Sequence, residues 1–165
     1  MTKFLLIVHV LAAIVAIGPV TVAASRFPPA ARAALADPND PAAVSAVRQL
    51  HRICVVYGFL GVAVPVFGFG TASSMGVLGS AWLIVSIVLT ALAAVLLVGL
   101  IVPGQAAIVG ALTGSAAVDG TRPSGNGPVD RAVTARLAMA TGLFNVLWAA
   151  VTVLMIVRPG STTGA

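Results

Sequence analysis

Long apolar runs alternate with short polar segments along this chain. The runs are Phe4–Ala24, Ile53–Gly70, Ala81–Val102 and Leu137–Val157, and none of them contains a charged residue. A helix needs about 20 apolar residues to cross the hydrocarbon core of a bilayer, with a range of roughly 17–25. The pattern therefore predicts an all-α membrane protein, an antiparallel four-transmembrane-helix bundle that forms one domain over residues 1–165.

Small residues recur at helical spacing within each run, and they predict the faces that pack together. In lipid, small side chains let helix backbones approach closely, and buried polar side chains join neighbouring helices. We expect Gly58, Gly61 and Pro65 to face inward in the second helix, and Asn145 to be a polar contact in the fourth. The other expected inward residues are His9, Ala13, Ala16 and Val20, then His51, Cys54 and Gly68, then Ser86, Thr90, Ala93 or Ala94 and Leu97, and finally Ala138, Gly142, Ala149 and Thr152.

Turn and capping signals lie in the first connecting segment, residues 25–52. Pro28-Pro29 predicts that the first helix ends where the chain leaves the membrane, and Asp37-Pro38-Asn39 predicts a turn. Asp40 followed by Pro41 predicts a helix start, because a carboxylate caps the first amides and proline suits the first helical position. We expect the second helix to begin there and run into the membrane.

The second long connection, residues 103–136, is rich in glycine and proline after residue 113 and is expected to be flexible. Gln105–Leu112 follows Pro103 and is expected to lie along the membrane interface. Thr71–Ser80 is expected to be a short, uncharged loop on the opposite side of the membrane.

Charge is scarce, and its distribution indicates orientation. Only 8% of the residues are charged and 59% are hydrophobic, whereas a soluble domain carries about 25% charged residues. This composition excludes a water-soluble fold. Basic residues are enriched in the cytoplasmic loops of membrane proteins. The two long connections hold Arg26, Arg32, Arg48, Arg52, Arg122, Arg131 and Arg136, against Lys3 and Arg158 on the other side.

This asymmetry predicts cytoplasmic loops, both termini outside, and a multi-pass protein of the plasma (inner) membrane. The net charge of +5 thus reports topology and contact with the lipid bilayer, and we expect no nucleic-acid partner. An alternative is that residues 1–24 form a cleavable signal peptide, because small residues precede Ser25. Cleavage would leave the arginines of both loops outside, which contradicts the charge rule, so we favour four spans.

His9 is the strongest candidate for chemistry. It lies inside the first apolar run, and an ionisable residue within a span suggests function. Imidazole can bind haem iron or copper. Met155 lies at a similar depth in the fourth run and Met75 in the outer loop, and a histidine with thioethers suits Cu(I). The competing interpretations are a neutral His9 hydrogen-bonded to a neighbouring helix and a Met155 that only packs.

Other polar residues have structural interpretations. His51 is expected at the cytoplasmic boundary, Cys54 as a packing residue, and Asn145 as a link between helices. His9 should lie near the outer side of the membrane and His51 at the inner side, so they cannot ligate one haem within a single chain; a haem with one histidine ligand or a dimeric arrangement remains open. No span contains Asp, Glu, Lys or Arg, and no nucleophile–base pair or phosphate-binding loop is present. We therefore expect no catalytic residues.

Four short stretches of the sequence resemble known proteins. They are the opening Leu6-Ile7-Val8-His9-Val10-Leu11-Ala12-Ala13, the basic start Arg48–Arg52 of the second span, Gly79-Ser80-Ala81-Trp82 and Val102-Pro103. The chain resembles a family of predicted four-helix bacterial membrane proteins of unknown function. That family is distantly similar to the copper-resistance protein D membrane domain and to HemJ-type protoporphyrinogen oxidases. The resemblance implies that His9 binds haem or copper. The HemJ-type enzymes need a lysine in a later span, which this chain lacks.

Three functions follow as hypotheses. The first is a non-catalytic accessory or assembly subunit whose partners are other membrane proteins or a second copy of the chain. The second is a haem- or copper-binding membrane protein that uses His9. The third is a small-solute permease, which would have to be an oligomer because four short helices leave little room for a pathway.

Overall fold

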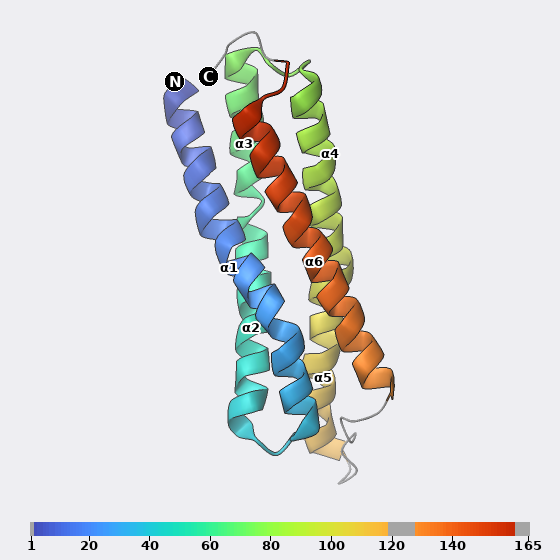
Figure 1. Cartoon of the computed structure of the whole chain (residues 1–165). Helices are drawn as coiled ribbons and strands as arrows, with labels where there is room; N and C mark the ends of the chain where they lie inside the picture. The colour runs from blue at the N-terminus through green and yellow to red at the C-terminus, as the bar shows by residue number, and fades with distance from the viewer. Residues whose placement is uncertain (1, 119–127, 161–165) are drawn as a thin grey trace.

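The chain folds into a bundle of long helices (Figure 1). The computed structural model describes residues 2–118 and 128–160, with side chains for residues 2–114 and 131–160. Every regular element in these residues is helical, which confirms the all-α part of the prediction. The elements are α1 (Thr2–Ala36), α2 (Pro41–Leu60), α3 (Ala63–Met75), α4 (Ala81–Leu96), the π-helix η1 (Leu97–Ile101), α5 (Val102–Val118) and α6 (Pro128–Val157).

Four helical segments are long and apolar enough to cross a membrane. They contain the four predicted apolar runs, but each is longer than its run. Their bounds are Thr2–Ala36, Pro41–Met75, Ala81–Gly114 and Arg131–Val157.

The bundle has two ends that differ in what they carry (Figure 1). The start of α1, the 76–80 turn and the end of α6 lie at one end, called here the terminal end. The 37–40 turn and the end of α5 lie at the other, called here the loop end. Residues 119–127 lie outside the described residues. They include Arg122 and belong to the segment that was expected to be flexible.

The first helix passes through Pro28 and Pro29 without ending, so the predicted stop at these prolines is wrong. Tertiary packing explains the difference. Phe27, Ala31 and Leu35 are buried in one cluster with Val47 of α2, Ile108 of α5 and Leu137 of α6. This burial compensates for the backbone donors that the prolines lack. The predicted turn at 37–39 and the start of α2 at Pro41 are confirmed, with the Asp40 carboxylate accepting from the Ala42 amide at 2.8 Å.

The second membrane-spanning segment is interrupted between α2 and α3. The Gly61 amide donates to the Tyr57 carbonyl at 2.8 Å, and the Val64 amide donates to the Gly61 carbonyl at 3.0 Å. Pro65 lies in the first turn of α3, where a missing amide is tolerated. Because α3 continues to Met75, this residue belongs to the helix rather than to the predicted 71–80 loop.

The third segment is one long helix through α4, η1 and α5. Gln105–Leu112 therefore does not lie along the membrane interface as predicted. Gln105 is fully buried and Ile108 is 6% exposed, so this part of α5 packs inside the loop end. The expected loop 103–136 is accordingly helical to Val118 and again from Pro128.

The predicted inward faces are correct for three segments and only partly correct for the fourth. Ala16 and Val20 of α1, Cys54 of α2 and Ser86 and Ala93 of α4 are buried. In α6, Ala138 and Gly142 are exposed, whereas Asn145, Ala149 and Thr152 line an open cavity between the helices. The buried residues of α6 are Thr134, Leu137, Thr141, Phe144 and Val151.

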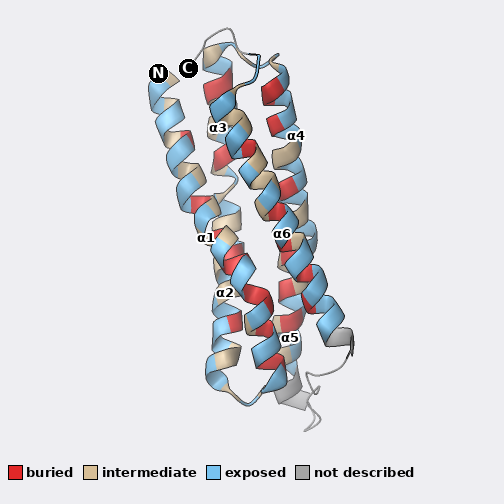
Figure 2. Cartoon of the chain, viewed as in Figure 1, coloured by how far each residue is buried: buried red, intermediate tan, exposed pale blue. Residues whose placement is uncertain are grey.

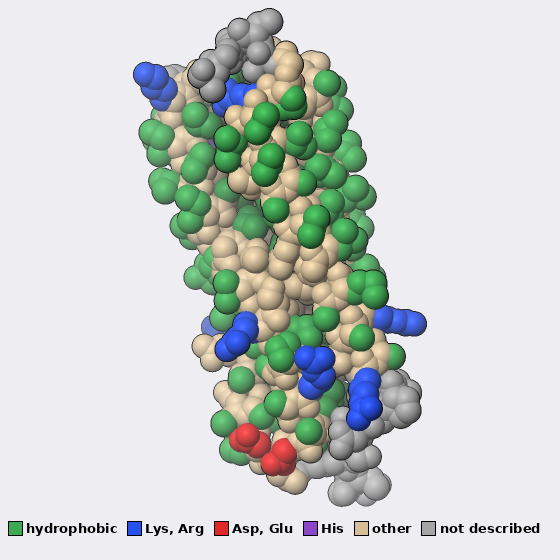
Figure 3. Space-filling model, viewed as in Figure 1, with side chains coloured by type: hydrophobic (Ala, Val, Ile, Leu, Met, Phe, Trp, Pro, Cys, Tyr) green, Lys and Arg blue, Asp and Glu red, His purple; other side chains and the backbone are tan. Residues whose placement is uncertain are grey.

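Many residues of the helices are exposed, and the face seen in Figure 3 has a middle band with hydrophobic side chains and no charged ones (Figures 2 and 3). Ile14, Phe59 and Met139 are 65%, 79% and 74% exposed, respectively. Figure 3 shows Lys and Arg side chains toward the two ends of the face in view, and acidic side chains only at the loop end. Such an extent of exposed apolar surface is incompatible with water and fits lipid.

Candidate ligand cavity at the terminal end

The helices form two pairs at the terminal end, with a cavity between them. There α3 packs mainly against α1, and α4 packs mainly against α6. An open cavity of about 1340 Å³ lies between the pairs, and its lining residues come from α1, α3, α4, α6 and the turn after α3. Ile14, Val22 and Val157 line it and are also exposed at the outer surface. Neither α2 nor α5 contributes a residue, so the cavity is confined to the terminal half of the bundle.

The cavity narrows into a packed core toward the loop end. Val20, Cys54, Leu97 and Phe144 belong to one buried cluster that draws residues from four segments. Below it, the cluster around Phe27 joins α1, α2, α5 and α6. The two helix pairs are therefore held together in the loop half and separated in the terminal half.

The cavity wall is mainly apolar and carries a few polar side chains. Apolar walls with a small number of polar groups are typical of sites for lipophilic ligands. The lining residues with a polar or charged side chain are His9, Thr21, Thr71, Thr90, Asn145, Trp148, Thr152 and Arg158.

His9 lines this cavity and faces the bundle, as the spacing of small residues in the first apolar run predicted. Its side chain is 9% exposed, and Nδ1 lies 2.8 Å from the carbonyl oxygen of Val64. A carbonyl oxygen can only accept, so Nδ1 carries the proton. In the neutral ring the lone pair then lies on Nε2, the atom available to bind a metal. This contact is the hydrogen bond to a neighbouring helix that was one of the two interpretations of His9 from the sequence. It uses only Nδ1, so a role of His9 as a ligand stays a prediction.

The two methionines considered with His9 line the same cavity. Met75 is at the end of α3 and Met155 is near the end of α6. Met155 also packs against the buried cluster of Ala72, Trp82 and Leu83. The three side chains of the copper hypothesis thus line one cavity and come from three separate helices.

Asn145 joins α6 to α1. Its Nδ2 donates to Ser25 Oγ at 3.0 Å, while its Oδ1 is buried without a partner. The indole Nε1 of Trp148, one turn further along α6, is also buried and unpartnered. Unpartnered buried polar atoms are rare in proteins, so this part of the cavity lining retains unused hydrogen-bonding capacity.

A second polar cluster lies in the loop half, away from the cavity. The Oε1 of Gln105 lies 3.3 Å from His51 Nδ1, and the Nε2 of Gln105 donates to Cys54 Sγ at 3.5 Å. The amide thereby links α5 to α2. Sequence reasoning missed Gln105 because it was expected at the membrane surface; a lone amide in an apolar helical stretch was the available signal.

The predicted site residues thus divide into two groups. His9, Met75, Met155, Asn145 and Pro65 line the cavity. His51 and Cys54 lie in the loop half, as their expected depth implied. A β-carbon added at Gly58 would come within 3.3 Å of Leu97, and one added at Gly61 within 3.0 Å of the Gly58 carbonyl oxygen. Among the described residues, no group of three or more His, Cys, Asp or Glu side chains is placed to hold a metal ion.

Comparisons of the chain with protein-family models, with curated proteins and with solved structures gave no match. The class of protein therefore follows from the fold alone: the described residues hold four apolar helices of spanning length, which fit a membrane protein. The family resemblance stays a prediction from the sequence.

Proposed function

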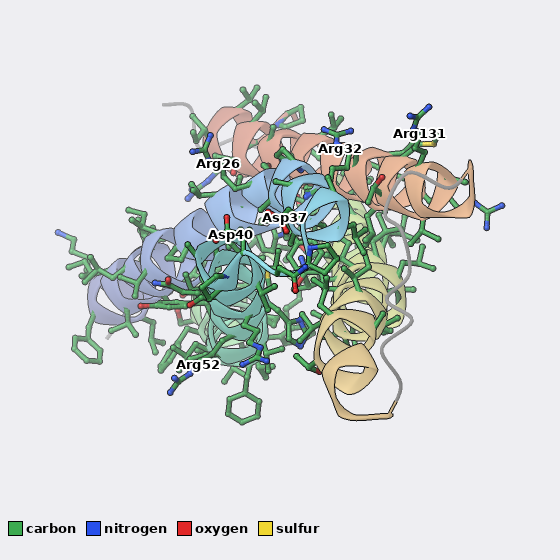
Figure 4. All side chains as sticks on the ribbon, turned by 90° about the horizontal axis from the view of Figure 1, so that it is seen from below. Arg26, Arg32, Asp37, Asp40, Arg52 and Arg131 are labelled. Carbon is green, nitrogen blue, oxygen red and sulfur yellow. The ribbon has the colours of Figure 1, made fainter. Side chains whose placement is uncertain are left out.

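We propose that the chain is a four-span plasma-membrane protein with an antiparallel bundle, the loop end in the cytoplasm and both termini outside. The exposed arginines support this orientation. Seen from the loop end, Arg32 and Arg131 point outward on one side of the bundle and Arg52 on the other (Figure 4). Positively charged side chains at one end match the cytoplasmic side of membrane proteins and the anionic headgroups there.

Cysteine labelling in intact cells tests this topology. In a Cys54→Ala background, a cysteine at Gly79 in the terminal-end turn should react with a membrane-impermeant maleimide, whereas one at Asn39 in the loop-end turn should react only after lysis. The opposite result would overturn the orientation.

We also propose that the protein works by holding a lipophilic ligand in the terminal-end cavity and does not catalyse a reaction by itself. The observation that carries this proposal is the cavity itself, with a volume of about 1340 Å³. Ligand pockets usually measure about 300–1,000 Å³ and have mainly apolar walls. A bundle that only needed to be stable would gain more by closing the two helix pairs onto each other.

His9 supports a haem or copper ligand as the second candidate. Its Nδ1 is fixed on the Val64 carbonyl, and this second contact orients an imidazole whose Nε2 can bind a metal. Met75 and Met155 line the same cavity and offer thioethers for Cu(I). A bound haem would supply redox chemistry, and the cavity wall would exclude water from it.

One purification tests both candidates. The protein is isolated in lipid nanodiscs, its visible spectrum and metal content are measured, and organic extracts are analysed by mass spectrometry. Haem would give a Soret band that His9→Ala removes and the matched His51→Ala retains. A lipophilic ligand would appear in the extract of wild type and disappear when Ala91→Trp fills the cavity. A wild-type protein with neither would overturn the proposal.

The accessory-subunit hypothesis stays a prediction, and co-purification from membranes with specific protein partners is its test. As for the permease hypothesis, the cavity of one chain is lined from the terminal half alone and is closed by the packed core around Phe144.

A further inference from the structure

We propose that the occupant of the cavity is an anionic phospholipid, with its phosphate at Arg158 and its acyl chains along the apolar walls. This inference rests on the proposed ligand-holding function and names the class of ligand. It is carried by the position, contacts and backbone conformation of Arg158.

Among the described residues, Arg158 is the only charged residue that lines the cavity. It follows the last residue of α6, at the terminal end, so it stands where the cavity reaches the end of the membrane-spanning region. The acidic residues with described side chains are Asp37 and Asp40 in the loop-end turn, and neither lines the cavity. The described part of the cavity wall therefore has a cationic end without an acidic residue.

The contacts of Arg158 hold its guanidinium in place. Its Nε donates to the Met155 carbonyl oxygen at 3.3 Å, and its Cζ lies 5.8 Å from the centroid of the Trp82 ring. A guanidinium has further N–H donors in a planar fork that matches the oxygens of a phosphate. The side chain is half-buried, and a partly desolvated charge is most stable beside a counter-ion.

The backbone of Arg158 is itself unusual. Its φ of 45° is the only positive value outside glycine among the described residues. The Arg158 amide donates to the Leu154 carbonyl at 2.9 Å, which ends α6 in a left-handed cap, a position usually taken by glycine. The left-handed conformation costs a residue with a side chain roughly 1–2 kcal/mol. Arginine at this position brings a charge to the cavity that glycine could not.

Depth and wall chemistry select a phospholipid rather than a water-soluble anion. The cavity lies between helices that span the membrane, and Ile87, Ala91 and Val151 are among its apolar wall residues. Trp82, under the guanidinium, is a residue type that favours the membrane–water interface. An acyl chain along these walls places a phosphate at the level of Trp82 and Arg158. An anionic headgroup is favoured over a zwitterionic one because Arg158 is a cation with no acidic neighbour among the described lining residues.

Native mass spectrometry tests the proposal. The protein is reconstituted in nanodiscs with equal amounts of phosphatidylglycerol and phosphatidylcholine, released, and scored for each retained lipid. Wild type should retain phosphatidylglycerol in preference. Arg158→Gln should lower that preference about fivefold, the effect expected from one basic residue near a headgroup. Arg158→Lys should keep most of it, and the exposed loop-end control Arg131→Gln should leave it unchanged. Circular dichroism would establish that each variant is folded.

The outcomes separate this inference from the proposed function. Equal retention of both lipids, or an unchanged preference in folded Arg158→Gln, would overturn the anionic phospholipid while leaving a ligand-holding cavity in place. Arg158→Gln could lose the preference while Ala91→Trp, which fills the cavity, still retains the lipid. That result would place the lipid outside the cavity and would also overturn the proposal. Absence of any retained lipid or other ligand from wild type would overturn both proposals.

Discussion

The imidazole of His9 lies so close to Gly68 that a β-carbon at residue 68 would come within 2.9 Å of His9 Cε1 and 3.1 Å of Nδ1. Real β-carbons do not approach other heavy atoms to 2.9 Å. Gly68 is thus the position in α3 that admits the His9 ring and lets its Nδ1 reach the Val64 carbonyl. The contact fixes the spacing of α1 and α3 along one side of the cavity.

Gly68→Ala should therefore destabilise the bundle by about 1–3 kcal/mol, the usual cost of overpacking. Unfolding in mixed detergent micelles measures this loss. Gly142→Ala is the matched control, because a β-carbon there meets nothing within 4 Å. Adding His9→Ala should abolish the effect of Gly68→Ala, since the clashing ring is gone. Additive effects of the two substitutions would contradict this account.

The Gln105 amide should stabilise the loop half through its contacts with His51 and Cys54. Gln105→Leu keeps the volume but leaves His51 Nδ1 without its partner, and we expect a loss of about 1 kcal/mol. The control is Gln49→Leu, since Gln49 is exposed on α2. Equal stability of the two variants would show that the buried amide is only a space-filling group.

Trp148→Phe should not lower stability. The indole Nε1 is buried without a hydrogen-bond partner, so the phenyl ring removes an unsatisfied donor. Its edge-to-face contact with Phe144, at 6.3 Å between centroids, is available to a phenylalanine ring as well. A clear drop in unfolding free energy would mean that Nε1 has a partner in the membrane, such as a bound water.

The hydrogen bond between Asn145 and Ser25 should couple α6 to α1. We expect a coupling energy of about 0.6 kcal/mol, typical of such bonds within membranes, from the cycle of Asn145→Ala, Ser25→Ala and the double variant. A cycle between Asn145→Ala and Ser73→Ala, a residue outside the cavity lining, should give a coupling near zero. Coupling of similar size in both cycles would argue against a direct Asn145–Ser25 bond.

Much of this fold was predictable because the membrane imposes a simple rule on the sequence. Apolar runs of spanning length gave the four helical segments, and Asp40-Pro41 gave the start of α2. The end of α1 could not be predicted from the local sequence. Pro28 and Pro29 stop a helix only when no tertiary contact compensates for the backbone amide donors that they lack. Phe27 and Leu35 supply that compensation through contacts with distant residues.

The candidate site was predictable only in part. The spacing of His9, Ala13 and Ala16 placed His9 toward the bundle, and the depth of Met155 placed it near His9. The inward face of α6 was predicted only in part, because small residues mark a packed face only where backbones approach closely. Asn145, Ala149 and Thr152 line the cavity, whereas the buried contacts of α6 come from larger residues such as Phe144 and Val151. The cavity is produced by the separation of two helix pairs, a property of the whole bundle that no single helix encodes.

The π-helix η1 has a consequence for the register of the third segment. Ala93, Leu97, Ile101 and Gln105 are all buried, one residue in every four. In a regular α-helix this repeat would drift by about 40° per step and leave the buried face. The wider turn at Leu97–Ile101 absorbs the surplus. Deletion of a single residue there would restore a plain α-helix and keep α5 on the same face, because eleven α-helical residues then separate Ala93 from Gln105 and turn by about three full turns. A deletion elsewhere in α4 would instead rotate α5 by about 100° and carry Gln105 away from His51, so η1 is the place in the third segment where the loss of one residue costs least.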